Sequence, residues 1–226
     1  MVMGQVIGDL LPLALGVALS PVPVIAVILM LLSPWATASS VAFVAGWVVG
    51  MTVLVCVVAL AVNPVDGGDA SAPSTLASWL KVVLGIAALL LAVQQWRSRP
   101  REGEAPKMPG WMNAVDDLGP GKAAGIGALL SSVNPKNLTL CVSAGITIGA
   151  GGLAGAEVAV AVAVYVLIGS LTVALPVAGF LLARDRVQKP LDGLRLWLTD
   201  NNATVMTVLL LVIGVTILGK GIGGLS

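Results

Sequence analysis

The chain has 226 residues, of which 58% are hydrophobic and 10% are charged, and its formal net charge is +1. Its apolar runs are too long for one water-soluble core, so the composition indicates an integral membrane protein. Without histidine and with only two cysteines, it offers no metal cluster or disulfide framework, and its net charge gives no argument for nucleic acid as a partner.

Six segments are long and apolar enough to cross a bilayer as helices, and the alternating pattern of barrel strands is absent. The first has no Lys or Arg at its start and carries Asp9, so we expect it to remain as a helix and not to be cleaved as a signal. We predict an all-α integral membrane protein with a single transmembrane domain, 1–226. Its six transmembrane helices are expected at 5–32, 38–62, 76–97, 122–150, 155–183 and 203–222.

The first and fourth segments share a motif. Ser20-Pro21-Val22-Pro23-Val24 aligns without a gap with Ser132-Val133-Asn134-Pro135-Lys136, and Pro23 pairs with Pro135. A proline removes a backbone donor and frees a carbonyl in the preceding turn, so we expect both helices to be interrupted. Paired interruptions near the middle of the membrane are typical of a transporter's binding site.

Each half of the chain holds three predicted spans, which is an odd number, so the second half would enter the membrane from the opposite side. The sequence therefore predicts a 3+3 inverted repeat with proline-broken helices 1 and 4. Repeat one covers about 1–97, a cytoplasmic linker about 98–121, and repeat two about 122–226.

Lys136 is the most informative residue of the fourth segment. Counted from Lys122 at about 1.5 Å per residue, it lies roughly 20 Å deep in a hydrocarbon layer about 30 Å thick. A cation at that depth costs at least ~2.5 kcal/mol, so it is a functional-site hypothesis by default. The alternative is that its aliphatic stem extends to an interface and leaves the charge in water.

The candidate substrate-binding residues surround the two interruptions, where hydroxyl and amide side chains could partner the freed carbonyls or a cargo. The alternative is an ordinary pair of kinks with no substrate. No catalytic or metal-binding residue is assigned. The candidates are Ser20, Pro21, Pro23, Ser131, Ser132, Asn134, Pro135, Lys136 and Asn137.

Lys and Arg gather in two links, between the third and fourth segments and between the fifth and sixth, which predicts that these links are cytoplasmic and both termini are outside. Within the second link, Val187, Leu191, Leu194 and Trp197 alternate with charges. They predict either a short amphipathic helix at the interface or a simple aromatic anchor. Glycines four residues apart favour close packing inside one bundle, with a homodimer face as the lesser option.

No nucleotide-binding motif and no nucleophile with a neighbouring base occur, so we predict neither ATP use nor enzymatic activity, and no cofactor.

The motif Ser20-Pro21-Val22-Pro23 and the run Ser132-Val133-Asn134-Pro135-Lys136-Asn137-Leu138 resemble the lysine-exporter superfamily. Within it they look most like the lipid-addressing branch, the peptidoglycolipid and sulfolipid addressing proteins of mycobacteria and related actinobacteria. The resemblance covers nearly the whole chain. One departure is Val22, because amino-acid exporters of the superfamily typically have Gly between the two prolines.

The resemblance implies a transporter in the bacterial cytoplasmic membrane that moves a cell-envelope glycolipid or an anionic lipid precursor. We expect membrane lipids as partners and a central polar cavity at the broken helices, where Lys136 binds an anionic part of the cargo. The alternative is a small-solute exporter for an amino acid or cation. A lipid carrier needs a side opening to the bilayer, whereas a solute exporter needs an enclosed polar cavity.

Overall fold

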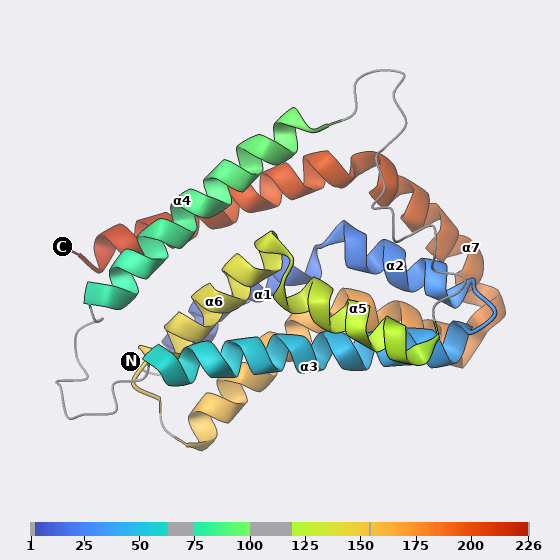
Figure 1. Cartoon of the computed structure of the whole chain (residues 1–226), viewed down its shortest axis with the longest axis horizontal. Coiled ribbons are helices and arrows are strands. Elements are labelled where there is room, and N and C mark those ends of the chain that lie inside the picture. Colours follow the sequence, from blue (N-terminus) through green and yellow to red (C-terminus); the bar gives the residue numbers. More distant parts are fainter. Residues whose placement is uncertain (1–2, 63–74, 100–118, 154, 226) are drawn as a thin grey trace.

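The computed structural model describes residues 3–62, 75–99, 119–153 and 155–225, and every regular element within these ranges is a helix. The predicted linker about 98–121 lies largely outside the described residues. In chain order the helices are α1 (Met3–Ala18), α2 (Pro21–Leu31), α3 (Ala36–Val62), α4 (Thr75–Arg97), α5 (Pro120–Ser132), α6 (Pro135–Gly149) and α7 (Ala156–Gly223), as Figure 1 shows.

The last helix is bent. Ala183 has non-helical dihedral angles, with φ −152° and ψ 56°, and divides α7 into two arms. The first arm is Ala156–Arg184 and the second arm is Arg186–Gly223. The described residues thus form eight helical segments, not the six helices predicted, because each of the two proline-containing spans is divided in two.

Fewer spans meet the requirements of length and apolar composition than the six predicted. Four described helices do so, namely α3, α4 and the two arms of α7, and α1 with α2, bent by 50°, would make a fifth. The pair α5 and α6 is not among them, because each helix is short and the pair carries Lys122, Lys136 and several amide and hydroxyl side chains. The structure therefore supports a multi-span membrane protein with four or five candidate spans.

The second arm of α7 merges two predicted elements. It contains 38 residues, which corresponds to a length of about 57 Å at about 1.5 Å per residue, well beyond a hydrocarbon core of about 30 Å. The predicted amphipathic stretch 187–197 and the predicted span 203–222 are consequently one continuous helix. Trp111, Val115 and Leu118, with Asp116 and Asp117 opposite, predict a similar amphipathic stretch or aromatic anchor before α5, and this stretch lies outside the described residues.

Close helix packing depends on small residues. In Figure 1, α3 and α5 run side by side, and α4 runs along the final part of α7. Where α3 crosses α5, a Cβ on Gly46 would lie 2.0 Å from the Ala124 carbonyl oxygen and one on Gly127 would lie 2.2 Å from that of Phe43. No side chain fits between backbones this close, so these glycines set the crossing.

The packing agrees with the prediction of close contacts inside one bundle. Gly145 and Gly149 of α6 also meet α3, whereas a Cβ on Gly4, Gly8, Gly121 or Gly125 would have nothing within 4 Å. The largest fully buried side chains include the aromatic residues Phe43, Trp47 and Tyr165.

The two described ends of the chain lie at one end of the bundle in Figure 1, and the bend of α7 lies at the other. The start of α5 is also at that second end. The start of α5, which follows one predicted basic link, thus lies at the same end as the bend of α7, which belongs to the other. The assignment of that end to the cytoplasm stays a prediction.

Candidate functional site

The first interruption lies between α1 and α2. Ser20 precedes α2 in an extended conformation, with φ −88° and ψ 110°, and its hydroxyl makes no capping hydrogen bond. Pro21 begins the helix and Pro23 follows in the first turn. Prolines are tolerated there because the first amides of a helix have no partner within it. Ser20, Pro21 and Val24 are all buried.

The second interruption lies between α5 and α6 and uses similar local chemistry. Asn134 is the N-cap of α6, and its side-chain oxygen accepts a hydrogen bond from the backbone amide of Lys136 at 3.1 Å. Pro135 follows as the first residue of the helix. Both helices are thus interrupted where the sequence predicts, by a capping residue followed by proline.

Lys136 connects the two interruptions. Its side chain is only 3% exposed, and its Nζ donates a hydrogen bond of 2.7 Å to the carbonyl oxygen of Gly16. That carbonyl belongs to the last turn of α1, where backbone oxygens lack helical partners and a nearby cation is favoured by the helix dipole. The alternative that Lys136 reaches an interface is wrong, because its ammonium group ends on α1 inside the protein.

Other groups complete the end of α1. The hydroxyl of Thr172, on the first arm of α7, donates to the carbonyl oxygen of Ala18. The backbone amide of Leu19 donates to the carbonyl oxygen of Leu15 at 2.9 Å. Helices far apart in the sequence therefore supply the donors that the interruption removes from α1.

The hydroxyl and amide side chains of the second interruption are mostly used locally. Ser131 and Ser132 both donate to the carbonyl oxygen of Ala128, and Asn137 Nδ2 donates to the carbonyl oxygen of Leu130 at 2.9 Å. Asn137 Oδ1 is buried and has no hydrogen-bond partner. It is therefore a free acceptor within the candidate set.

The structure joins the two interruptions through one contact and not through their prolines. Lys136 reaches α1, but α2 packs chiefly against α7 and α3, while α6 packs chiefly against α3 and α1. The residues that the sequence groups into one site are therefore divided between two neighbouring places, with Ser20 and Pro21 on the α7 side.

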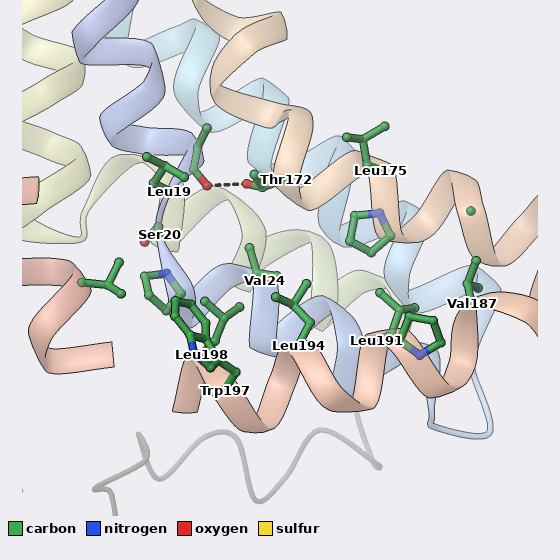
Figure 2. Close-up of a pocket in the computed structure, with 16 residues that line it drawn as sticks. Leu19, Ser20, Val24, Thr172, Leu175, Val187, Leu191, Leu194, Trp197 and Leu198 are labelled. Carbon is green, nitrogen blue, oxygen red and sulfur yellow. Dashed lines mark hydrogen bonds between the residues drawn. The ribbon is translucent and has the colours of Figure 1, made fainter. Parts of the chain in front are cut away.

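A cavity of about 550 Å³ opens beside the first interruption. Figure 2 shows its walls: the end of α1 and start of α2 on one side, and both arms of α7 on the others. Ser20 and Thr172 bring the hydroxyls of the lining, and the rest is apolar apart from the indole of Trp197. The walls consist of Ala18, Leu19, Ser20, Pro21, Val24, Thr172, Leu175, Pro176, Gly179, Val187, Pro190, Leu191, Leu194, Trp197, Leu198 and Val205.

A family model described as Sap, sulfolipid-1-addressing protein, matches residues 10–223. The match begins in α1, contains both interruptions and the whole cavity, and ends at the last residue of α7. The chain belongs to this family. No match was found among curated proteins or solved structures.

Membership of the sulfolipid-addressing family agrees with the lipid-addressing resemblance seen in the sequence and gives the protein a lipid-related role in a membrane. Most of the residues that form the cavity wall on α7 are not among the site residues predicted from the sequence. The signal was present in the spacing of Val187, Leu191 and Leu194, which predicts one apolar helix face. The sequence predicts for this stretch an amphipathic helix at the interface or an aromatic anchor, and in the structure its apolar face lines the cavity.

A second polar cluster lies at the other end of the bundle. Asp9 of α1 forms an ion pair of 2.7 Å with Lys220 of α7, and Lys81 of α4 lines the same small pocket. Among the described residues, no group of His, Cys, Asp or Glu could hold a metal ion.

Proposed function

We propose that this protein carries a cell-envelope glycolipid or an anionic lipid precursor across the bacterial cytoplasmic membrane, with both termini outside. The observation that carries the proposal is the apolar cavity at the first interruption, because a lipid carrier needs a chain-sized space that opens sideways to the bilayer. Leu19, Leu175 and Trp197 of its wall are 48%, 62% and 54% exposed, so the wall continues onto the membrane-facing surface. The family match supports the lipid cargo.

The interruptions would form the polar part of the route. We also propose that the chain is a 3+3 inverted repeat of the lysine-exporter superfamily. The support for this is that both helices are interrupted at the paired motifs. The ammonium group of Lys136 already has the Gly16 carbonyl as a partner. An anionic group of the cargo would replace that carbonyl, and Asn137 Oδ1 would accept from a hydroxyl of the cargo. Binding would thus release the end of α1 from α6.

In this proposal the protein transports its cargo without enzymatic chemistry, binds no cofactor and has no nucleic acid as a partner. Membrane lipids are the partners, and the cargo is an anionic lipid. A homodimer would use the open glycines, Gly4 and Gly8 or Gly121 and Gly125, because the other glycine pairs are occupied inside the bundle.

The second candidate function is export of a small solute. Lys136 is compatible with it, because the carboxylate of an amino acid could also replace the Gly16 carbonyl as the partner of the ammonium group. A cavity with apolar walls gives such a solute few partners, since its buried polar groups would be left without hydrogen bonds.

Reconstitution tests the proposal directly. Proteoliposomes with nitrobenzoxadiazole-labelled phosphatidylglycerol are treated with dithionite, which bleaches the label only in the outer leaflet. We expect the protein to speed transbilayer movement over that in protein-free vesicles, and Lys136→Met to return it to the protein-free rate. Lys122→Met is the matched control, because Lys122 is exposed and outside the candidate site.

A protein that leaves the lipid rate unchanged but exchanges a labelled amino acid across the same vesicles would replace lipid transport with the second candidate. Full lipid activity in Lys136→Met would remove Lys136 from the route.

A further inference from the structure

The two arms of α7 present matching apolar faces to the cavity. On the first arm Thr172, Leu175, Pro176 and Gly179 follow one another at helical spacing, and on the second arm Val187, Leu191, Leu194 and Leu198 do the same. The arms meet at the bend at Ala183, so the space between them widens away from the bend. The wall of α2 and the end of α1 close the third side of this groove (Figure 2).

The chemistry of the groove selects an alkyl chain. Of its two hydroxyls, that of Thr172 is already bonded to the Ala18 carbonyl, so a polar solute would find little to replace its lost water. An alkyl chain needs no such partner and gains about 0.8 kcal/mol for each methylene group buried. The volume of about 550 Å³ lies within the range of roughly 300–1,000 Å³ typical of ligand sites.

Positive charge flanks the apolar face of the second arm. Arg186 directly precedes Val187 and Arg195 directly follows Leu194, so the helical period places one arginine on each side of the face. Arg184, at the bend, lies over the ring of Phe180 at 4.9 Å. Asp192 offsets part of this charge, at 3.8 Å from Arg195. Arg186, the first residue of the second arm, is exposed and remains for an anion at the end of the groove near the bend.

We infer that the groove between α2 and the two arms of α7 binds an acyl chain of an anionic membrane lipid, with the lipid headgroup beside Arg186. This inference rests on the proposed function, under which the groove is the place where the cargo enters from the leaflet at the basic end of the bundle. The chain lies along the apolar faces of both arms and reaches Ser20 at the first interruption.

Photochemical labelling tests the groove. Proteoliposomes contain phosphatidylglycerol with a diazirine on one acyl chain, and the labelled residues are mapped by mass spectrometry after irradiation. We expect label on the groove faces of both arms in excess of label at Leu167, which faces the bilayer with 68% exposure and lies outside the groove. Phosphatidylcholine with the same chain should label the groove less.

A matched pair of glycine variants supplies the control. A Cβ on Gly179 would lie 3.5 Å from Val187 Cγ1 and point between the arms, whereas one on Gly193 has nothing within 4 Å and Gly193 is outside the wall. Gly179→Leu should reduce groove labelling by roughly tenfold, the effect of displacing about two methylene groups. Gly193→Leu should leave it unchanged, and label at Leu167 should persist in both variants as a sign of folding.

The outcomes separate the two proposals. Groove label no higher than that at Leu167, or unchanged by Gly179→Leu with the Leu167 label intact, overturns the acyl-chain site even if lipid transport is observed. Equal labelling by the two headgroups overturns the anionic preference. Groove label that Gly179→Leu removes, in a protein that moves no lipid, upholds the site and overturns the transport function instead.

Discussion

At the scale of single residues, buried polar side chains in this protein bond mainly to its own backbone. Thr139, Ser143 and Thr147 lie on one face of α6 and each donates to the carbonyl oxygen four residues earlier, at 2.8 to 2.9 Å. A row of hydroxyls in the sequence therefore does not make a polar channel by itself. Lys136 differs because its partner, the Gly16 carbonyl, belongs to another helix and is freed only by an interruption.

The first prediction concerns the stability of Lys136→Met. The substitution removes a cation whose burial costs at least ~2.5 kcal/mol but also leaves a buried carbonyl without its donor, at about 1–3 kcal/mol. These terms oppose each other, so we expect the free energy of unfolding to change by no more than about 1 kcal/mol. Steric trapping in bilayers measures it. A loss above about 3 kcal/mol would make Lys136 a structural residue first.

At the scale of elements, the interruptions and the crossings between helices are both set by local residue choice. Proline after a capping residue begins α2 and α6 anew, and glycine lets α3 approach α5 within backbone contact. The two caps differ, since Asn134 bonds to the start of its helix and Ser20 does not.

The capping difference gives the second prediction. Asn134→Ala should lower the free energy of unfolding by about 1 kcal/mol, within the 0.5–2 kcal/mol typical of a lost N-cap. Ser20→Ala should have no capping effect, because the Ser20 hydroxyl makes no such bond. Unfolding of both variants in the same bilayer is the measurement. Equal losses would mean that the Asn134 bond does not stabilise α6.

The third prediction concerns the crossing of α3 and α5. In Gly127→Ala the new methyl group would lie 2.2 Å from the Phe43 carbonyl oxygen, and backbone cannot move aside without separating the helices. We expect a loss of about 1–3 kcal/mol in the free energy of unfolding, as for other overpacked sites. Gly125→Ala is the matched control on the same helix, because its Cβ meets nothing within 4 Å. A neutral Gly127→Ala would contradict the close crossing.

At the scale of the whole molecule, the chain closes on itself. Both described ends lie at one end of the bundle (Figure 1), where Asp9 of α1 pairs with Lys220 near the end of α7. The bend of α7 lies at the opposite end, where the cavity begins. The bundle thus has the ion pair between α1 and α7 at one end and an apolar groove flanked by basic residues at the other.

The fourth prediction concerns the ion pair between Asp9 and Lys220. A double-mutant cycle with Asp9→Asn and Lys220→Met should give a coupling energy of about 0.2–1 kcal/mol, because both side chains are partly exposed and screened by solvent. Unfolding of the four proteins at low salt provides the value, and raising the salt should reduce it. A coupling energy of zero at low salt would show that the contact at 2.7 Å does not hold α1 to α7.

Some features follow from the sequence because they are local. Apolar composition predicts the membrane environment, and proline with its capping neighbour predicts each interruption within a few residues of where α1 and α5 end. The start of α5, which follows one predicted basic link, and the bend of α7, which belongs to the other, share one end of the bundle, as the charge pattern predicts for alternating spans. The family match agrees with the lipid-addressing resemblance that the two motifs carry.

Other features depend on contacts between distant segments, and only the tertiary structure decides them. Periodicity identifies Val187, Leu191 and Leu194 as one apolar face but cannot say whether that face meets lipid or another helix, and the bend at Ala183 turns it toward α2. Likewise the depth of Lys136 follows from counting residues, whereas its partner Gly16 lies 120 positions away. A sequence determines which groups need burial or a partner, and the packing of the folded chain decides which partner each one finds.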